Sequence, residues 1–288
     1  TWCAAPRDAL CLQPAIGDSS WRHDNTHFLA VAAPAYRESD PKFAGRLMWA
    51  WRRSGSPYAG TPPRGSGVPV GGKENFLLIE PEIKAVPQSL ESEIQPRGGY
   101  AVLRSDYDRP DEKCMFFTCG KRRIIHRAQH KHRDLNSFSL FAYQVPLALD
   151  YGSGTYLTSD DLAWYNLTVA HNTVEFGGLP QDYEDGRIAE YRVLPEADYV
   201  VGDATPACWA LTFQYYRHIL FVKPDYFVIW DFIRSFVPAE WMLHTPAKEV
   251  RQAGSRLECI TPWQVTLDVH FFLPGSPLDL RPGKSMPV

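Results

Sequence analysis

The sequence of 288 residues has no long hydrophobic run and little cysteine. No segment approaches the ~20 consecutive apolar residues that a membrane-spanning helix needs, so we expect no membrane span. None of the six cysteines has the Cys-x-x-Cys spacing of common zinc-binding motifs. Cys114 and Cys119 lie in one expected strand at an odd spacing, so their side chains point to opposite faces and we expect no disulfide between them.

Net charge is also low, at −3, but its distribution is uneven. The segment 121–133 carries many cationic side chains and no acid. Its positive field would attract an anionic ligand, and a solvated basic surface is the alternative. No RNA- or DNA-binding motif accompanies it, so we expect no nucleic-acid partner. The chain starts with Thr1 and shows no signal-peptide pattern, from which we expect a fragment or a processed form.

The first third of the chain predicts helices followed by a linker. Residues 24–53 have apolar side chains at three- and four-residue intervals, and Asp40 before Pro41 is a typical helix start. Two helices cannot bury such apolar faces alone, so they need a larger body beside them. Residues 54–75 are rich in Gly, Pro and Ser, as in a linker or long loop.

From residue 97 the chain changes to short β-rich runs separated by turn signals such as Lys223-Pro224-Asp225. Many short strands at this spacing predict an antiparallel sandwich. The expected strands include residues 100–103, 114–119, 137–143, 168–176, 199–201, 209–216, 219–222, 226–232 and 265–273.

A cluster of imidazoles and carboxylates lies between residues 130 and 171. His130, His132 and Asp134 alternate in an expected strand and therefore share one face. Asp150 ends the next apolar run, and His171 lies within an expected strand. This donor set suits zinc or another divalent ion. Both histidines of the pair can bind one ion, or one can bind while the other serves as an acid or base.

Three motifs around this cluster resemble one known family. They are His130-x-His132-x-Asp134 with the strand after it, Pro146-Leu147-Ala148-Leu149-Asp150-Tyr151-Gly152, and Ala170-His171-Asn172-Thr173-Val174. Together they resemble the heparinase II/III-like polysaccharide lyases, which include alginate lyases. The resemblance implies an α+β multidomain chain, with the end of an (α/α) toroid at residues 1–60, a linker at 61–95 and an antiparallel β-sandwich (supersandwich) at 96–288.

The same resemblance implies site roles. His130 would be a catalytic residue facing the cleft between toroid and sandwich, and His132, Asp150 and His171 would hold a structural zinc ion. The family chemistry is β-elimination on a uronic acid, in which a base removes the C5 proton and an acid, usually Tyr, protonates the departing O4. Tyr156 is a candidate for that tyrosine. The family's other tyrosine, and the residue that neutralises the carboxylate, are expected upstream of Thr1.

Further residues are candidates for binding substrate. Gln129 and His126 lie beside His130 in the basic segment, and Arg104 is a candidate partner for a carboxylate, with an ion pair as the alternative. Asp134 is expected to orient a histidine rather than to bind the ion. The partner implied by the resemblance is an anionic polysaccharide or oligosaccharide, and the implied location is the periplasm or the exterior of the cell.

Two other functions fit the same residues. The sandwich can be a zinc-stabilised module that binds glycan without cleaving it, in which case changing His130 would leave binding intact. Alternatively, His130, His132, Asp150 and His171 together can form a metal-dependent hydrolase or oxygenase. Chelation would then abolish chemistry while the fold survives, whereas loss of a structural ion lowers stability first.

Overall fold

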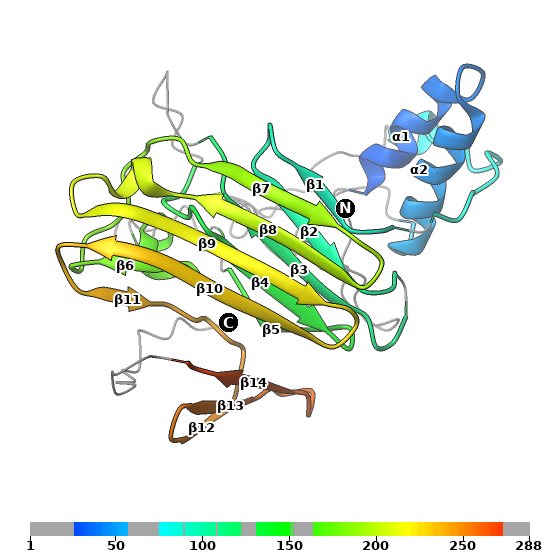
Figure 1. Cartoon of the computed structure of the whole chain (residues 1–288). Helices are drawn as coiled ribbons and strands as arrows, with labels where there is room; N and C mark the ends of the chain where they lie inside the picture. The colour runs from blue at the N-terminus through cyan, green and yellow to red at the C-terminus, as the bar shows by residue number, and fades with distance from the viewer. Residues whose placement is uncertain are drawn as a thin grey trace.

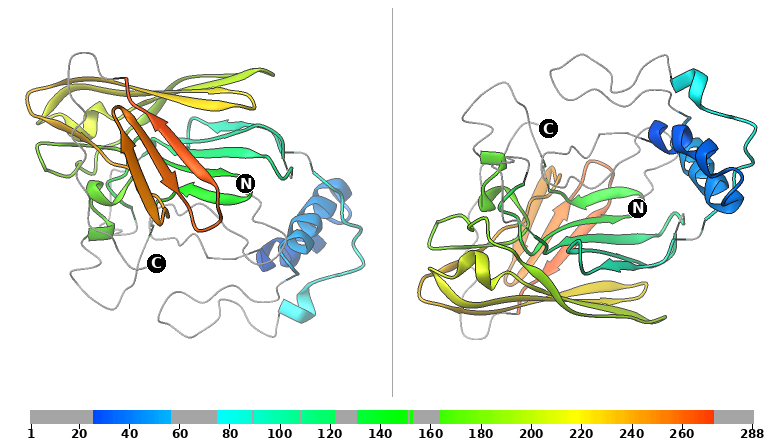
Figure 2. Two further views of the ribbon diagram at one scale, coloured as in Figure 1. Left: turned by 90° about the horizontal axis from the view of Figure 1, so that it is seen from below. Right: turned by 90° about the horizontal axis from the view of Figure 1, so that it is seen from above.

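The computed structural model describes residues 26–56, 75–88, 90–107, 109–121, 131–150, 152 and 164–272. Two antiparallel sheets are stacked as the layers of a sandwich, and a helical hairpin lies at one end of them (Figure 1, Figure 2). The predicted β-sandwich is therefore confirmed. The toroid remains a prediction, because the described residues before the sandwich form only three helices. None of the helices in the described part of the chain is long and apolar enough to cross a membrane.

The helical part begins as the sequence predicts. α1 (His27–Tyr36) and α2 (Pro41–Arg53) form the hairpin, and α3 (Asn75–Leu78) is a single turn. The Asp40 carboxylate accepts a hydrogen bond from the Phe43 N–H at 2.9 Å, and Pro41 occupies the first turn, so both parts of the predicted helix start are present. The two helices bury a small apolar core of their own, which includes Ala30, Met48 and Trp51.

The first sheet has the strand order β1-β2-β3-β4-β5. Its strands are β1 (Glu93–Gln95), β2 (Tyr100–Arg104), β3 (Lys113–Thr118), β4 (Ser137–Ala142) and β5 (Val145–Ala148). β1 lies in the last residues of the segment that we expected to be a linker, and it pairs with β2. Cys119 belongs to the core between the sheets and Cys114 to a cluster on the other face of this sheet, so their side chains point to opposite faces, as predicted.

The second sheet has the order β10-β9-β8-β7. Its strands are β7 (Arg187–Val193), β8 (Ala197–Asp203), β9 (Thr212–Val222) and β10 (Tyr226–Ser235). Exposure alternates residue by residue along β10, as expected for a strand with one face on the core. Residues 209–216 and 219–222 were predicted as two strands, but one strand, β9, covers residues 212–222, and residues 209–211 form a turn before it. The polar pair Arg217-His218 interrupts the apolar pattern, yet Arg217 is fully buried in the strand through paired contacts.

Two smaller sheets complete the described fold. β6 (Val174–Phe176) pairs with β11 (Ala239–Trp241), while β12 (Glu249–Ala253), β13 (Arg256–Ile260) and β14 (Thr266–His270) form a three-stranded sheet. Side chains from both main sheets fill one core, which includes Phe117, Phe138 and Leu140 from the first sheet and Tyr215, Ile219 and Phe221 from the second.

Two strand predictions near the candidate site are wrong. Residues 168–176 form a 3₁₀ helix, η1 (Thr168–Ala170), then a bend, and only then β6. The residues from Lys131 to Asp134 are irregular as well, so the alternation of one strand face does not apply to them. The Thr168 hydroxyl explains part of this, because it donates to Arg133 O at 2.9 Å and accepts from the Gln181 N–H at 2.8 Å. Backbone groups satisfied by side chains do not need a strand partner.

Replacing Gly99, at the start of the first sheet, should lower the stability of the protein. Its φ is +74°, and a Cβ there would overlap the backbone of Gly120. We expect Gly99→Ala to lower the free energy of unfolding by about 3 kcal/mol, since overpacking adds to the cost of the left-handed backbone. Gly254→Ala is the matched control, because its φ is +59° and nothing lies within 4 Å. Denaturant titration should show that the control loses only about 1 kcal/mol of the free energy of unfolding. Equal losses in the two variants would contradict the predicted overlap with the Gly120 backbone.

Candidate metal centre

Three segments distant in sequence bring a group of ligand-type side chains together. Asp134 precedes β4, Asp150 follows β5, and His171 lies between η1 and β6. One potential ligand atom from each of these three side chains lies within 4.8 Å of the other two. Their exposures are 2%, 6% and 1%, so the group is buried. Strand pairing of β4 with β5 accounts for the approach of the first two segments.

Asp150 and His171 form the centre of the group. His171 Nδ1 lies 2.7 Å from Asp150 Oδ2. Burial by itself raises the pKa of Asp150, but the nearby His171, the Gly152 N–H and the His132 ring together hold this pKa below its ordinary value. A carboxylate that stays ionised in the interior is what a metal ligand requires.

The structure places the predicted third ligand, His132, beside this group. Its ring centroid is 5.3 Å from that of His171, and the residue is 2% exposed. Asp134, which we expected only to orient a histidine, places a carboxylate oxygen within 4.8 Å of ligand atoms of Asp150 and His171. The structure therefore brings Asp150 and His171 together, adds Asp134 to them, and places the His132 ring next to this group.

A dense hydrogen-bond network holds these segments in place. Asn172 donates through Nδ2 to Phe138 O at 2.8 Å and accepts at Oδ1 from the His244 N–H at 2.6 Å. The Ser137 hydroxyl donates to Asp150 Oδ2 at 3.1 Å and accepts from the Asn172 N–H at 3.2 Å. The polar residues around His171 thus connect the segments that carry Asp134 and Asp150, which a strand reading of the motif did not predict.

Gln181 is a residue of this site that the sequence analysis missed. Its side-chain amide holds both backbone groups of Leu135, accepting from the N–H at 2.9 Å and donating to the carbonyl at 3.1 Å. The Thr173 hydroxyl donates to the same carbonyl at 2.7 Å. Asn136 then turns the chain into β4 with a φ of 61°, a left-handed conformation that Asn tolerates. No local motif marks Gln181, because its partner is distant in sequence.

Residues 131–133, just after His130, are contacted by side chains and backbone from a distant part of the chain. Asn166 accepts the Arg133 N–H at its backbone carbonyl at 3.0 Å and donates through its side chain to Lys131 O at 3.3 Å. The Arg133 guanidinium lies 4.7 Å from the centre of the Tyr183 ring.

Four predicted site residues lie outside the described residues: His126, Gln129, His130 and Tyr156.

Comparison with known proteins identifies the family. Residues 88–272 match the C-terminal domain of the heparinase II/III-like family. The chain belongs to this family. The match begins before β1, and it contains every described member of the candidate metal centre. No curated protein matches the sequence.

Solved structures of this family have the same fold. The heparan sulfate lyase HepC from Pedobacter heparinus is 16% identical, with a TM-score of 0.62 over 90% of this chain and 36% of HepC. A heparinase III is 17% identical, with a TM-score of 0.63 over 86% of this chain and 35% of its own. A heparinase III with methylated lysines is 15% identical, with a TM-score of 0.64 over 88% of this chain and 34% of its own. This chain thus spans about a third of the length of these heparinase structures.

Arg104 has a different environment from the one we predicted. It is 2% exposed, and its Nη1 lies 2.8 Å from Glu112 Oε1. Its guanidinium also lies 4.9 Å from the centre of the Tyr107 ring. Burial of the guanidinium in this ion pair argues against the predicted role in substrate binding, which stays a prediction. The alternative that we stated for Arg104, an ion pair, is confirmed.

The buried Glu112 carboxyl should make the stability of this heparinase-like sandwich depend on pH. Burial raises its pKa from 4.5 to about 7, although Arg104 opposes the shift. The fold therefore favours the protonated acid, which accepts a hydrogen bond from Arg104, and the contact becomes a full ion pair only as the pH rises above about 7. The contribution of Glu112 to stability is full below pH 4.5 and is lost as the pH rises through about 7. We expect the free energy of unfolding to fall by up to about 3 kcal/mol from pH 5 to pH 8. Denaturant titration at several pH values should show that Glu112→Gln largely removes this pH dependence of the free energy of unfolding. Glu93→Gln, at an exposed site on β1, is the control and should keep it.

His244 and Trp164 lie next to the candidate centre. The His244 ring is edge-on to Trp164, with centroids 6.1 Å apart, and its Nε2 lies 3.0 Å from Val169 O. Burial and the neighbouring His171 lower the pKa of His244, so it is neutral near pH 7. The Leu149 N–H donates to His244 O at 2.9 Å, which connects this residue to the Asp150 segment.

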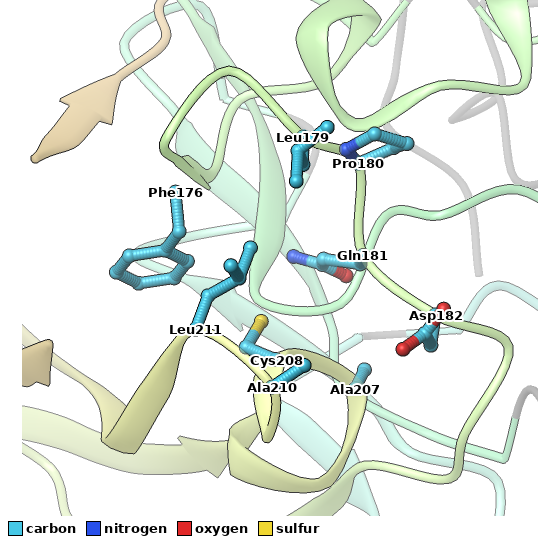
Figure 3. Close-up of a pocket in the computed structure, with 9 residues that line it drawn as sticks. All are labelled: Phe176, Leu179, Pro180, Gln181, Asp182, Ala207, Cys208, Ala210 and Leu211. Carbon is cyan, nitrogen blue, oxygen red and sulfur yellow. The ribbon is translucent and has the colours of Figure 1, made fainter. Parts of the chain in front are cut away.

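A pocket near β6 lacks the properties of a sugar site. Figure 3 shows its lining, which includes Phe176, Gln181, Cys208 and Leu211. Its internal volume of about 20 Å³ suits one water rather than a sugar ring. Burial raises the pKa of Cys208 to about 12, so the thiol is protonated and unreactive at neutral pH.

Proposed function

We propose that this chain carries the sandwich of a polysaccharide lyase that cleaves a uronic-acid-containing glycan by β-elimination. Membership of the heparinase II/III-like family over residues 88–272 is the observation that carries the proposal. In this proposal, residues 1–60 are the end of a helical toroid and residues 61–95 connect it to the sandwich. The proposed location is the periplasm or the cell exterior.

The donors of the candidate metal centre suit a zinc ion. Two carboxylates and an imidazole within 4.8 Å of one another, with the His132 ring beside them, match the oxygen and nitrogen ligands that zinc accepts. Asp134 and Asp150 are both buried, and a cation between two carboxylates so close together would be favoured by both negative charges. When bound, zinc would supply a rigid cross-link between three segments.

Burial of the centre favours a structural over a catalytic ion. A catalytic zinc site keeps one position open to water or substrate, whereas a structural site is closed by protein ligands. Asp134, Asp150 and His171 are each at most 6% exposed, which supports a closed site. This burial argues against the metal-dependent hydrolase, which needs access to the ion.

In the proposed mechanism the centre and its network position the catalytic histidine. His130 lies two residues before His132 and directly before Lys131, whose carbonyl Asn166 holds. We propose that His130 acts at the C5 proton of the uronate and that Tyr156 protonates the departing O4. Gln129 and His126 would contact the glycan from the same basic segment. These roles come from the family resemblance and the positions of the residues in the sequence.

The substrate class can be tested directly. The solved neighbours include a heparan sulfate lyase, so heparan sulfate is the first substrate to try, followed by heparin and alginate. Incubation with the full-length protein should release unsaturated oligosaccharides that absorb in the near ultraviolet. Saturated products would instead indicate a hydrolase, and binding without any product would indicate a glycan-binding module. Either result would overturn the proposed lyase.

A further inference from the structure

Arg217 is a fully buried arginine whose partners lie on the segments of the candidate metal centre. It sits on β9 and is 0% exposed. Its Nη1 donates to two backbone carbonyls, Asn136 O at 2.7 Å and Asn172 O at 2.8 Å. Its Nε and Nη2 each lie 2.7 Å from one carboxylate oxygen of Asp231 on β10. The guanidinium therefore connects the second sheet to both segments at once.

The two carbonyls bound by Arg217 belong to residues next to candidate ligands. Asn136 lies two residues after Asp134, and Asn172 directly follows His171. A planar guanidinium offers donors in a fixed arrangement, so two carbonyls on the same nitrogen have a fixed separation. The bidentate bond to Asp231 sets the orientation of that plane. Arg217 thus acts as a spacer between the Asp134 and His171 segments.

The charge of Arg217 is present throughout the accessible pH range. Burial alone would lower its pKa, but the paired Asp231 outweighs this effect and the pKa lies above its ordinary value. The Phe138 and Trp241 rings lie near the guanidinium, at 5.7 and 6.0 Å from its central carbon, and help to cover it. The spacer therefore neither titrates near neutral pH nor needs a bound ion to hold its charge.

We propose that Arg217 is a positioning residue that sets the separation of Asp134 and His171 and so preorganises the centre for zinc. This inference rests on the metal centre of the proposed function. Residues around ligands typically change metal affinity by about 10- to 100-fold when they are replaced. Lysine keeps the charge but is a point donor, so it cannot hold two carbonyls and a bidentate carboxylate in one plane.

The first test compares Arg217→Lys with Arg104→Lys. Arg104 is the matched control because it is also a buried, carboxylate-paired arginine, but its partner Glu112 lies outside the candidate centre. Competition with a chromophoric chelator should show zinc affinity about 10- to 100-fold lower in Arg217→Lys and unchanged in Arg104→Lys, although both variants lose stability. Equal zinc affinity in wild type and Arg217→Lys would overturn the proposal.

Amide hydrogen exchange on the metal-free proteins separates this inference from the zinc proposal. The Leu135 and Asn172 amides donate to Gln181 Oε1 at 2.9 Å and Ser137 Oγ at 3.2 Å, so they report on the two segments without bonding Arg217. We expect faster exchange at these amides in Arg217→Lys and at β2–β3 amides in Arg104→Lys. If wild type binds no zinc, the proposed centre fails, and exchange still decides the positioning role.

A second variant covers the case in which Arg217→Lys does not fold. Asp231→Asn keeps the guanidinium but weakens the bidentate bond that orients it. We expect an intermediate loss of zinc affinity and intermediate exchange at the Leu135 and Asn172 amides. A folded Asp231→Asn protein with wild-type exchange and affinity would contradict the proposal.

Discussion

Chelation of zinc is expected to lower the unfolding temperature of the chain by about 8–16 °C. An ion at about 1,000 times its dissociation constant stabilises the folded state by about 4 kcal/mol, and each kcal/mol corresponds to about 2–4 °C in a domain of this size. The effect should be large because Asp134, Asp150 and His171 come from three separate segments of the sandwich. Scanning calorimetry of zinc-loaded, chelated and reloaded protein measures it.

Matched variants show whether the effect belongs to this centre. Asp150→Asn removes a charged donor of the group and should abolish the difference between loaded and chelated protein. Asp203 is equally buried, at 5% against 6% for Asp150, but its side chain pairs with Arg187 on the second sheet. Asp203→Asn should therefore lose stability and keep its response to zinc. Identical unfolding of loaded and chelated wild type would rule out a structural ion.

His130→Ala is expected to lower kcat on the uronate glycan by about 10²- to 10⁴-fold, the usual contribution of a general acid–base residue. Zinc content and unfolding temperature should not change, because His130 is not among the proposed ligands. The rate of release of unsaturated products by the full-length protein measures the loss. His132→Ala should instead lower the zinc content and the stability of the protein before it affects the rate, since the His132 ring adjoins His171.

The control for this prediction is a histidine elsewhere on the same sandwich. His270 is exposed on β14, so His270→Ala should keep kcat, zinc content and unfolding temperature. A rate within twofold of wild type in His130→Ala would remove the catalytic role of this residue. Loss of zinc in the same variant would make it a ligand instead, which would favour the alternative in which both histidines bind one ion.

Local features of this protein were readable from the sequence because their causes are local. Asp40 and Pro41 mark a helix start through bonds within one turn, and the alternation along β10 follows from one strand having two faces. The motifs around His132, Asp150 and His171 were likewise sufficient to predict the family, which residues 88–272 confirm.

Other features follow from contacts between distant segments. Asp134 joins Asp150 and His171 because β4 and β5 pair and the chain returns before β6. Arg217 continues β9 as a buried residue only because Asp231 and two remote carbonyls satisfy its charge and donors. Arg104 is in an ion pair because Glu112 faces it across a turn. Periodicity was enough to predict the two helices and many of the strands, and the resemblance of three motifs was enough to predict the family. The partners of buried charges depended on tertiary packing, since hydrogen bonds and ion pairs act only between groups that the fold brings within a few ångströms.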